Sequence, residues 1–126
     1  MTTSESLQLF LKLERSTAEC DEGPEVTMRP GIITIRYDTE TDAGREWTTL
    51  RFLGAVAIRV TPEPAVSAMV ARAYSMVAVI DNSAWMASMN QACRNGKLPS
   101  NLKHFVLFFD HYGGIEAIAR SCEVEE

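Results

Sequence analysis

The sequence predicts an α+β domain, in which an antiparallel or mixed sheet, built from two β-hairpins plus a short strand, carries two or three helices mainly on one face. Three observations predict this fold class. Residues 103–120 form an apolar run, a turn and an alternating run, which is the pattern of a hairpin. Residues 31–61 contain two more alternating segments joined by a polar loop. Between the hairpins, apolar residues recur with helical spacing.

Length and composition predict a single domain over residues 1–126, because 46% of the residues are apolar, which is enough for one core. No apolar run suits a membrane span and the N-terminus lacks a signal-peptide pattern, so we expect a cytoplasmic protein. The cysteines, Cys20, Cys93 and Cys122, have no metal-binding spacing. We therefore expect reduced thiols, no metal site and no cofactor.

The net charge is −5 and is unevenly spread. Residues 1–50 carry 5 basic and 10 acidic side chains, residues 51–104 carry 6 and 2, and residues 105–126 carry 1 and 5. The acidic ends argue against nucleic-acid binding, because phosphate backbones attract basic surfaces. They would suit a basic protein partner, although solubility also explains them.

Residues 4–15 fit two patterns. Leucines at every second position are typical of a strand, whereas Leu7, Phe10 and Leu11 would share one helix face. The composition, rich in Leu, Gln, Lys and Glu, slightly favours a helix. Both interpretations stay open at this point.

The first hairpin is predicted from alternation over residues 31–39 and 46–61. Tyr37 must lie opposite Thr48 or Leu50 if the apolar sides of both strands are to share one face, since a one-residue slip reverses every side chain.

The second of these strands is long, and Gly54 predicts a bulge or bend within it. The segment Thr61–Pro64 is typical of a helix start with Thr61 as the cap, and an apolar stripe follows from Val66 to Tyr74. Residues 76–80 predict a short buried strand.

A second helix is predicted over residues 84–94, capped by the segment Asp81–Ser83. Its inner face would hold Met86, Met89 and Cys93. For Ser83 a capping role is favoured over a nucleophilic one, because no nucleophile-elbow motif surrounds it.

The C-terminal hairpin is predicted to turn at residues 110–113, with Gly113 in the left-handed conformation. That turn places Phe109 opposite Ile115 and makes one face apolar. The other face would carry Phe108 beside Glu116, with His104 at the far end of the strand. This mixed face is expected to be partly wet or to meet a partner.

Candidate chemical groups are few. Asp110, His111 and Glu116 are a weak alternative for acid–base catalysis near the turn, since a carboxylate beside an imidazole can form a general base. Asp and His also favour turns, so a solvated turn is the preferred interpretation. His104 lies about 20 Å along the strand from His111 at ~3.3 Å per residue, too far to share a site.

Four residues are candidates for binding a partner. Trp47 falls on the polar side of its strand beside Arg51, and Trp and Arg are frequent anchors of protein interfaces. Phe108, on the mixed face, and Tyr112, in the turn, are further aromatic candidates. Burial of Trp47 by another element would be the ordinary alternative.

The spacing of Trp47–Ala55, Asp81–Trp85, His104–Asp110 and Ile115–Ala119 resembles that of small uncharacterised bacterial α+β proteins, some of the immunity-protein kind. In that group a compact acidic domain binds and blocks a toxin. The resemblance is one of hydrophobic spacing, so it transfers no binding residue.

These features together predict a non-enzymatic cytoplasmic module that binds an unknown protein, for which the acidic ends suit a basic one, and that binds neither nucleic acid nor membrane. One alternative is a small enzyme or ligand-binding domain with a pocket near the C-terminal hairpin. Another is a structural homo-oligomer, such as a homodimer.

Overall fold

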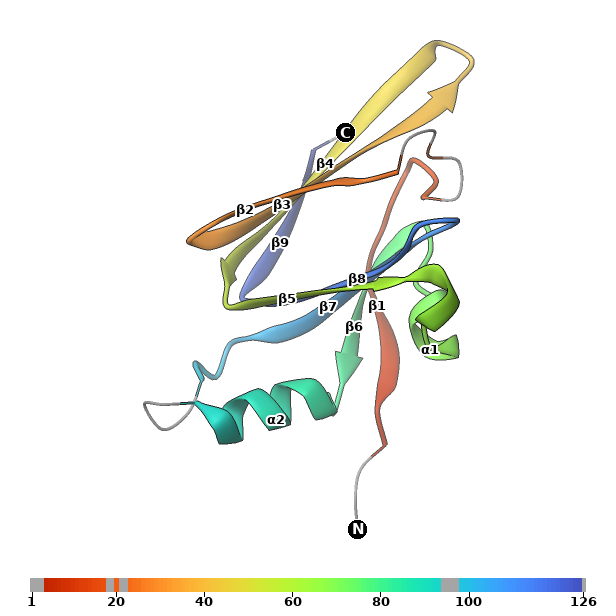
Figure 1. The fold of residues 1–126 in the computed structure, drawn as a ribbon. Coiled ribbons are helices and arrows are strands. Elements are labelled where there is room, and N and C mark those ends of the chain that lie inside the picture. Colours follow the sequence, from red (N-terminus) through yellow and green to blue (C-terminus); the bar gives the residue numbers. More distant parts are fainter. Residues whose placement is uncertain (1–3, 18–19, 21–22, 94–97, 126) are drawn as a thin grey trace.

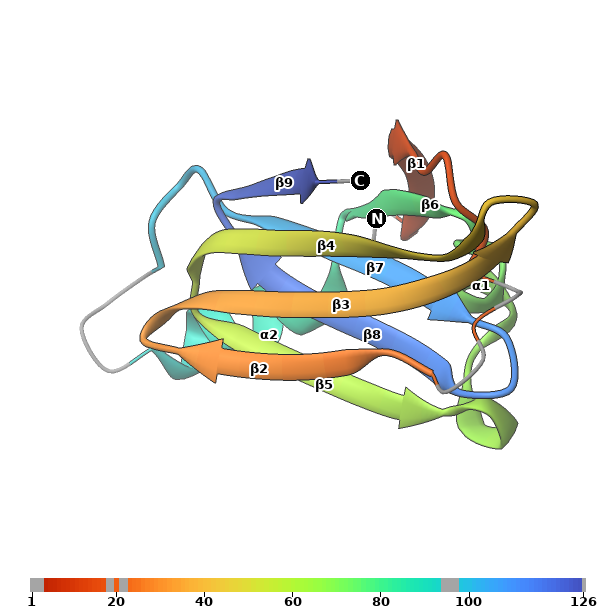
Figure 2. The same cartoon turned by 90° about the horizontal axis from the view of Figure 1, so that it is seen from above.

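The computed structural model describes residues 4–17, 20, 23–93 and 98–125 and shows a mostly β protein. Two antiparallel sheets of five and four strands lie face to face (Figures 1 and 2). Helices α1 and α2 lie on the five-stranded sheet, on the side away from the other sheet (Figure 1). The expected α+β class is therefore wrong. The N-terminal segment expected as a helix is a strand, and the long strand expected after residue 46 is two strands, so the chain forms a two-sheet sandwich.

The five-stranded sheet has the order β1-β6-β7-β8-β5. Its strands are β1 (Ser6–Lys12), β5 (Ala57–Pro62), β6 (Met76–Asp81), β7 (Lys103–Phe109) and β8 (Gly113–Ala119). The four-stranded sheet, of order β2-β3-β4-β9, contains β2 (Glu25–Arg29), β3 (Gly31–Thr41), β4 (Gly44–Ala55) and β9 (Ser121–Glu125). The helical elements are the 3₁₀ turn η1 (Glu63–Ala65), α1 (Ala68–Ala71) and α2 (Ala84–Ala92).

The main core fills the space between the sheets, because alternate residues of each sheet point inward. Its largest buried side chains are Ile35, Tyr37, Leu50, Phe52, Phe105, Leu107, Phe109 and Ile115. A smaller core lies on the opposite face of the five-stranded sheet, under α1, and contains Val70, Ala73, Ala78, Ile80 and Val106.

The N-terminal segment is strand β1 rather than the slightly favoured helix. β1 pairs antiparallel with β6, with Leu7 opposite Ile80 and Leu9 opposite Ala78. Helix propensities differ by less than about 1 kcal/mol per residue, so an available strand edge outweighs them.

The predicted pairing of Tyr37 is confirmed, since it lies opposite Thr48. The long second strand, however, is two strands that belong to different sheets. The chain turns at Gly54, where φ is +63°, and leaves the ladder at Val56 between β4 and β5. A Cβ at Gly54 would lie 2.9 Å from the Cβ of Arg120, so a side chain there would collide with Arg120, the residue that directly precedes β9.

The first predicted helix is much shorter than expected. Thr61 and Pro62 belong to β5, since they pair with the glycines that open β8, and the cap of α1 is Ser67. The short buried strand expected at 76–80 is confirmed as β6. In the part of the chain that the structure describes, no helix combines the length and the apolar character needed to cross a bilayer.

The second predicted helix begins where expected, with Ser83 as its cap, and α2 ends at Ala92. Met86, Met89 and Cys93, expected on its inner face, are among the less exposed residues of this segment, but each is only half-buried.

The C-terminal hairpin is present, but its predicted register is wrong by two residues. Phe109 lies opposite Gly113 rather than Ile115. The reason is the turn, in which His111 takes the left-handed conformation at φ +64°, so the loop is only three residues long. A shift of two keeps every side chain on its predicted face.

Candidate functional site

Helix α2 carries no charged side chain, and none of its nine residues is buried. A surface helix usually buries an apolar stripe and exposes charged residues on its other face. In α2 the larger side chains, Trp85, Met86 and Met89, are half-exposed, and the remainder are small or neutral polar residues. The helix therefore depends on its start for attachment to the sheet.

The start of α2 is tied down by two side chains. The Ser83 Oγ accepts the Met86 backbone N–H at 3.0 Å and lies 2.6 Å from Nδ1 of His104. The Glu5 carboxylate accepts the Ala84 backbone N–H at 2.8 Å. Both acceptors satisfy N–H groups that a helix start leaves without an intrahelical partner.

A buried polar network continues from Ser83 into the sheet. His104 Nε2 lies 2.8 Å from Glu116 Oε1, and Arg59 contacts both oxygens of Glu116, at 2.8 Å from Nη2 and 3.1 Å from Nε. The Glu116 carboxylate can only accept, so His104 carries a hydrogen on Nε2, and Nδ1 of the neutral ring then accepts the hydroxyl hydrogen of Ser83. Every polar group of the network is then satisfied when His104 carries its hydrogen on Nε2, facing the carboxylate.

Trp85 covers this network. Its ring meets the His104 ring edge-on, with centroids 5.1 Å apart, and the Arg59 guanidinium lies 4.4 Å from the Trp85 ring centroid. Such a cation–π contact adds about 0.5–2 kcal/mol, depending on desolvation. Trp85 thus joins the first turn of α2 to both the cation and the imidazole.

The electrostatics favour a permanently charged pair. Burial raises the pKa of a carboxyl group, but hydrogen bonds from His104 and Arg59, together with the positive charge of Arg59, outweigh burial and lower the pKa of Glu116 to about 2. The hydrogen bond to Glu116 raises the pKa of Arg59 despite partial burial. Glu116 therefore remains a carboxylate at neutral pH.

Two hollows adjoin α2. One of about 710 Å³ lies between α2 and strands β6 and β7, with Ser83 and His104 in its lining. The other, of about 700 Å³, lies between α2 and the segment 98–100. Their size is within the range of about 300–1,000 Å³ that is typical of ligand pockets.

Ser83, His104 and Glu116 have the order of a nucleophile, a base and an orienting carboxylate. Their other contacts argue against that chemistry: the Ser83 oxygen caps a helix, and Arg59 clamps the carboxylate. The His104 side chain is only 1% exposed. The arrangement holds α2 in position rather than presenting a reactive hydroxyl group.

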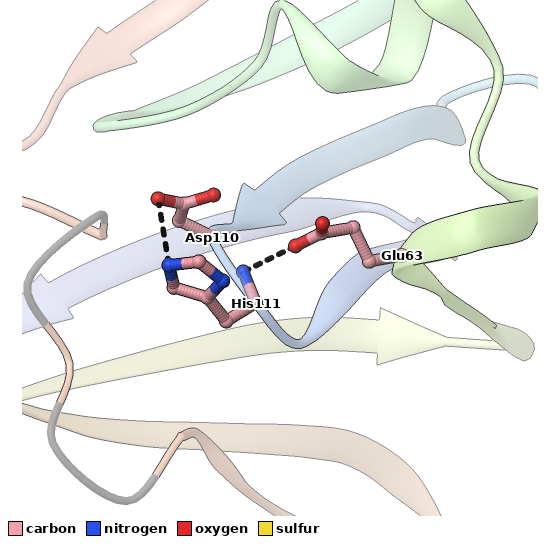
Figure 3. Close-up of side chains that lie close together, drawn as sticks. All are labelled: Glu63, Asp110 and His111. Carbon is pink, nitrogen blue, oxygen red and sulfur yellow. Dashed lines mark hydrogen bonds and ion pairs between the residues drawn. The ribbon is translucent and has the colours of Figure 1, made fainter.

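The weak catalytic set of Asp110, His111 and Glu116 is not brought together. Asp110 and His111 are exposed in the β7–β8 turn, whereas Glu116 is buried beside His104. Instead Glu63 approaches the turn, and its carboxylate accepts the His111 backbone N–H (Figure 3).

Glu63, Asp110 and His111 are the group that could hold a metal ion in the described part of the chain, with possible ligand atoms within 4.8 Å of one another. All three are exposed, and His111 Nε2 lies 3.6 Å from Asp110 Oδ2 (Figure 3). Their contacts with each other account for the grouping, so we assign no ion to it.

Trp47 and Arg51 lie on the outer face of the four-stranded sheet, as their alternation predicts. Both are half-buried, since the Arg36 guanidinium lies 4.0 Å from the Trp47 ring centroid and Arg51 pairs with Glu125 at 3.1 Å. This face is a candidate contact surface separate from α2.

Phe108 and Tyr112 lie elsewhere. Phe108 is half-buried on the helix-bearing face of the five-stranded sheet, where its backbone N–H bonds to Ala73. Tyr112 is 37% exposed in the β7–β8 turn. The four predicted binding residues therefore do not form one surface.

Sequence reasoning missed the network of Arg59, Ser83, Trp85, His104 and Glu116. The available signal was the two-residue alternation of side chains along each strand, which correctly puts His104 and Glu116 on one face of the hairpin. The two-residue error in register placed His104 beside Arg120 instead, and nothing local predicts that β5 pairs with β8.

No family model, no curated protein and no solved structure matches this chain.

Proposed function

We propose that this protein is a non-enzymatic protein-binding module whose contact surface is α2 together with its two adjoining hollows, called here the α2 surface. The observation that carries the proposal is that α2 exposes neutral and apolar side chains and no charge. Depletion of charge, with exposed Trp and Met, is typical of the centre of a protein interface.

The buried network supports this proposal. A helix of nine residues is too short to be stable in isolation, and α2 contributes no buried residue to the core. Ser83, Trp85 and Glu5 compensate by fixing its first turn to the sheet and to the N-terminal segment. A helix held this way presents its side chains in a fixed geometry, which lowers the entropy lost on binding.

The alternative of a small enzyme with a pocket near the C-terminal hairpin has less support. The hollow does border His104, but both nitrogens of that ring already have partners. A general base needs a free position within reach of a substrate proton.

An immunity-like role, blocking a toxin through protein contacts, is the particular form of this proposal that the resemblance in hydrophobic spacing suggests. The basic character of the partner stays a prediction from the net charge of the chain. Helix α2 itself neither attracts nor repels a basic protein over long distances, because it is uncharged.

Site-specific photocrosslinking in the native host tests the proposal. A photoreactive residue at Gln91, exposed on α2, is expected to capture one protein, whereas the same residue at Thr27, exposed on β2, is not. Met89→Glu should abolish the adduct, because burying an unpaired charge in an apolar contact is costly.

Equal capture from both positions, or none from Gln91, would contradict the proposal. Light scattering on the purified protein separates the homo-oligomer alternative: a monomer supports a different partner, whereas a dimer lost on Met89→Glu would show that α2 binds a second copy.

A further inference from the structure

The hollow between α2 and strands β6 and β7, called here the α2 pocket, has a lining that selects one kind of occupant. Its wall on the helix side consists of Ala84, Met86, Ala87, Ser88 and Gln91. Its lining on the sheet side includes Val79, Ile80 and Leu102. None of these side chains is charged, so the pocket offers mainly apolar contacts.

The charged side chains of the lining are at its margin. Asp81 and Lys103 are both exposed, and each lies at the end of a strand of the five-stranded sheet. An apolar centre with a polar margin is the usual anatomy of a protein contact site.

The polar groups at the base of the pocket, around Ser83, are already satisfied, whereas Ser88 and Gln91 on its helix wall are exposed to solvent. Ser83 donates a hydrogen bond to His104 and accepts one from the Met86 N–H. The second ring nitrogen of His104 donates to Glu116, and the Ala84 N–H donates to Glu5. A polar group that reaches this base would lose its bonds to water and find no replacement there, which costs about 1–3 kcal/mol per buried unsatisfied group in proteins. An apolar group meets no such penalty.

We infer that the α2 pocket is the anchor site of the α2 surface and binds a bulky apolar side chain from the partner protein. This inference rests on the proposed function and specifies the chemistry of the partner. Its volume of about 710 Å³ leaves room for an aromatic side chain with its flanking peptide. The partner then supplies one large apolar residue at the centre of its contact, flanked by polar residues that reach Asp81 and Lys103.

Methyl NMR on protein labelled at methionine tests this inference without knowledge of the partner. The probe is N-acetyltryptophanamide, and N-acetylglycinamide is its polar counterpart. A saturable shift of the Met86 methyl signal is expected with the tryptophan probe alone. Met28, which is 62% exposed on β2, is the internal control and should not shift.

Two tryptophan substitutions, made at residues of similar size, sharpen the test. Ser88 and Ala92 are both exposed on α2, but only Ser88 lines the pocket. Ser88→Trp should therefore abolish the saturable shift, whereas Ala92→Trp should leave it. Unchanged signals of Met69 and Met76, which pack at the smaller core, show that each variant is folded.

The absence of a saturable Met86 shift, an equal shift at Met28, or equal binding of both probes would overturn the inference. A Met86 signal that depends on protein concentration without any probe would assign the pocket to a second copy and also overturn it. Crosslinking from Gln91 without probe binding would leave the proposed function standing. Probe binding without any crosslinked protein would refute the proposed function and leave only an apolar pocket.

Discussion

His104 and Glu116, on neighbouring strands β7 and β8, are joined by a 2.8 Å contact between Nε2 and Oε1, with side chains only 1% and 4% exposed. They lie diagonally across the ladder, since His104 pairs with Ile118. A buried charge is costly unless an opposite charge is paired with it. Arg59 provides that positive charge from the solvent side of Glu116. The contact therefore defines one position for Ser83 and the start of α2.

Removing the charge at the centre of the network should destabilise the protein. Glu116→Gln leaves Arg59 without its bidentate partner, and we expect a loss of about 2–3 kcal/mol, below the range for fully buried pairs because Arg59 is half-exposed. Urea unfolding measures it. The matched control is Glu125→Gln, which breaks the exposed pair with Arg51 and should cost less than about 1 kcal/mol. Equal losses would contradict the assignment.

Stability should fall in acid through Glu116. Its folded pKa of about 2 lies below the unfolded value of 4.5, so the unfolded chain binds the extra proton as the pH falls. The stabilising contribution is full above about pH 4.5 and is lost toward about pH 2. Unfolding free energies of the wild type and Glu116→Gln should therefore converge as the pH falls through this window. A constant difference between them would show that Glu116 does not titrate in this way.

Ser83→Ala should cost more than the loss of a helix cap. The cap alone contributes about 1 kcal/mol, and the change also leaves buried His104 Nδ1 without a donor, for a total of about 2–3 kcal/mol. Ser67→Ala is the control, since Ser67 caps α1 by accepting the Val70 N–H and has no buried imidazole beside it. Thermal unfolding followed by circular dichroism compares them; similar losses would mean that the bond to His104 adds nothing.

The start of β8 should tolerate no side chain. Gly113 has φ +141°, and a Cβ there would lie 2.0 Å from the Thr61 carbonyl oxygen, so we expect Gly113→Ala to cost about 3 kcal/mol or more. Gly44 has φ +107° but open space around it, so Gly44→Ala should cost only the backbone strain, about 1–2 kcal/mol. Chemical unfolding of both variants checks this order, and the reverse order would contradict the β5–β8 contact.

Two cysteines should resist alkylation in the folded protein. Burial, followed by the charge of Asp38, raises the pKa of Cys20 to about 11, and burial with Glu123 raises that of Cys122 to about 12. Since the thiolate is the nucleophile, iodoacetamide at mildly alkaline pH should modify both far more slowly than in urea. Peptide mass spectrometry resolves the sites; equal rates in both conditions would refute the burial.

Local patterns in the sequence were sufficient for several elements. Alternation predicted β3 and the facing of Tyr37 with Thr48, and the cap residue Ser83 predicted where α2 begins. The same alternation also placed His104 and Glu116 on one face of the hairpin despite the wrong register. These properties depend on residues close in sequence, because the side-chain period and the capping bond are local.

Tertiary structure decided the fold class and the site. Residues 6–12 form a strand because the edge of β6, about 70 residues away, pairs with them, and Arg59 reaches Glu116 only because β5 crosses from β4 to pair with β8. Such pairings depend on which edges are free after the chain has collapsed, and on a register set by turns as short as the one at His111. The alternation within a strand predicts which of its faces is buried. Which strand it pairs with depends on contacts made by the whole chain.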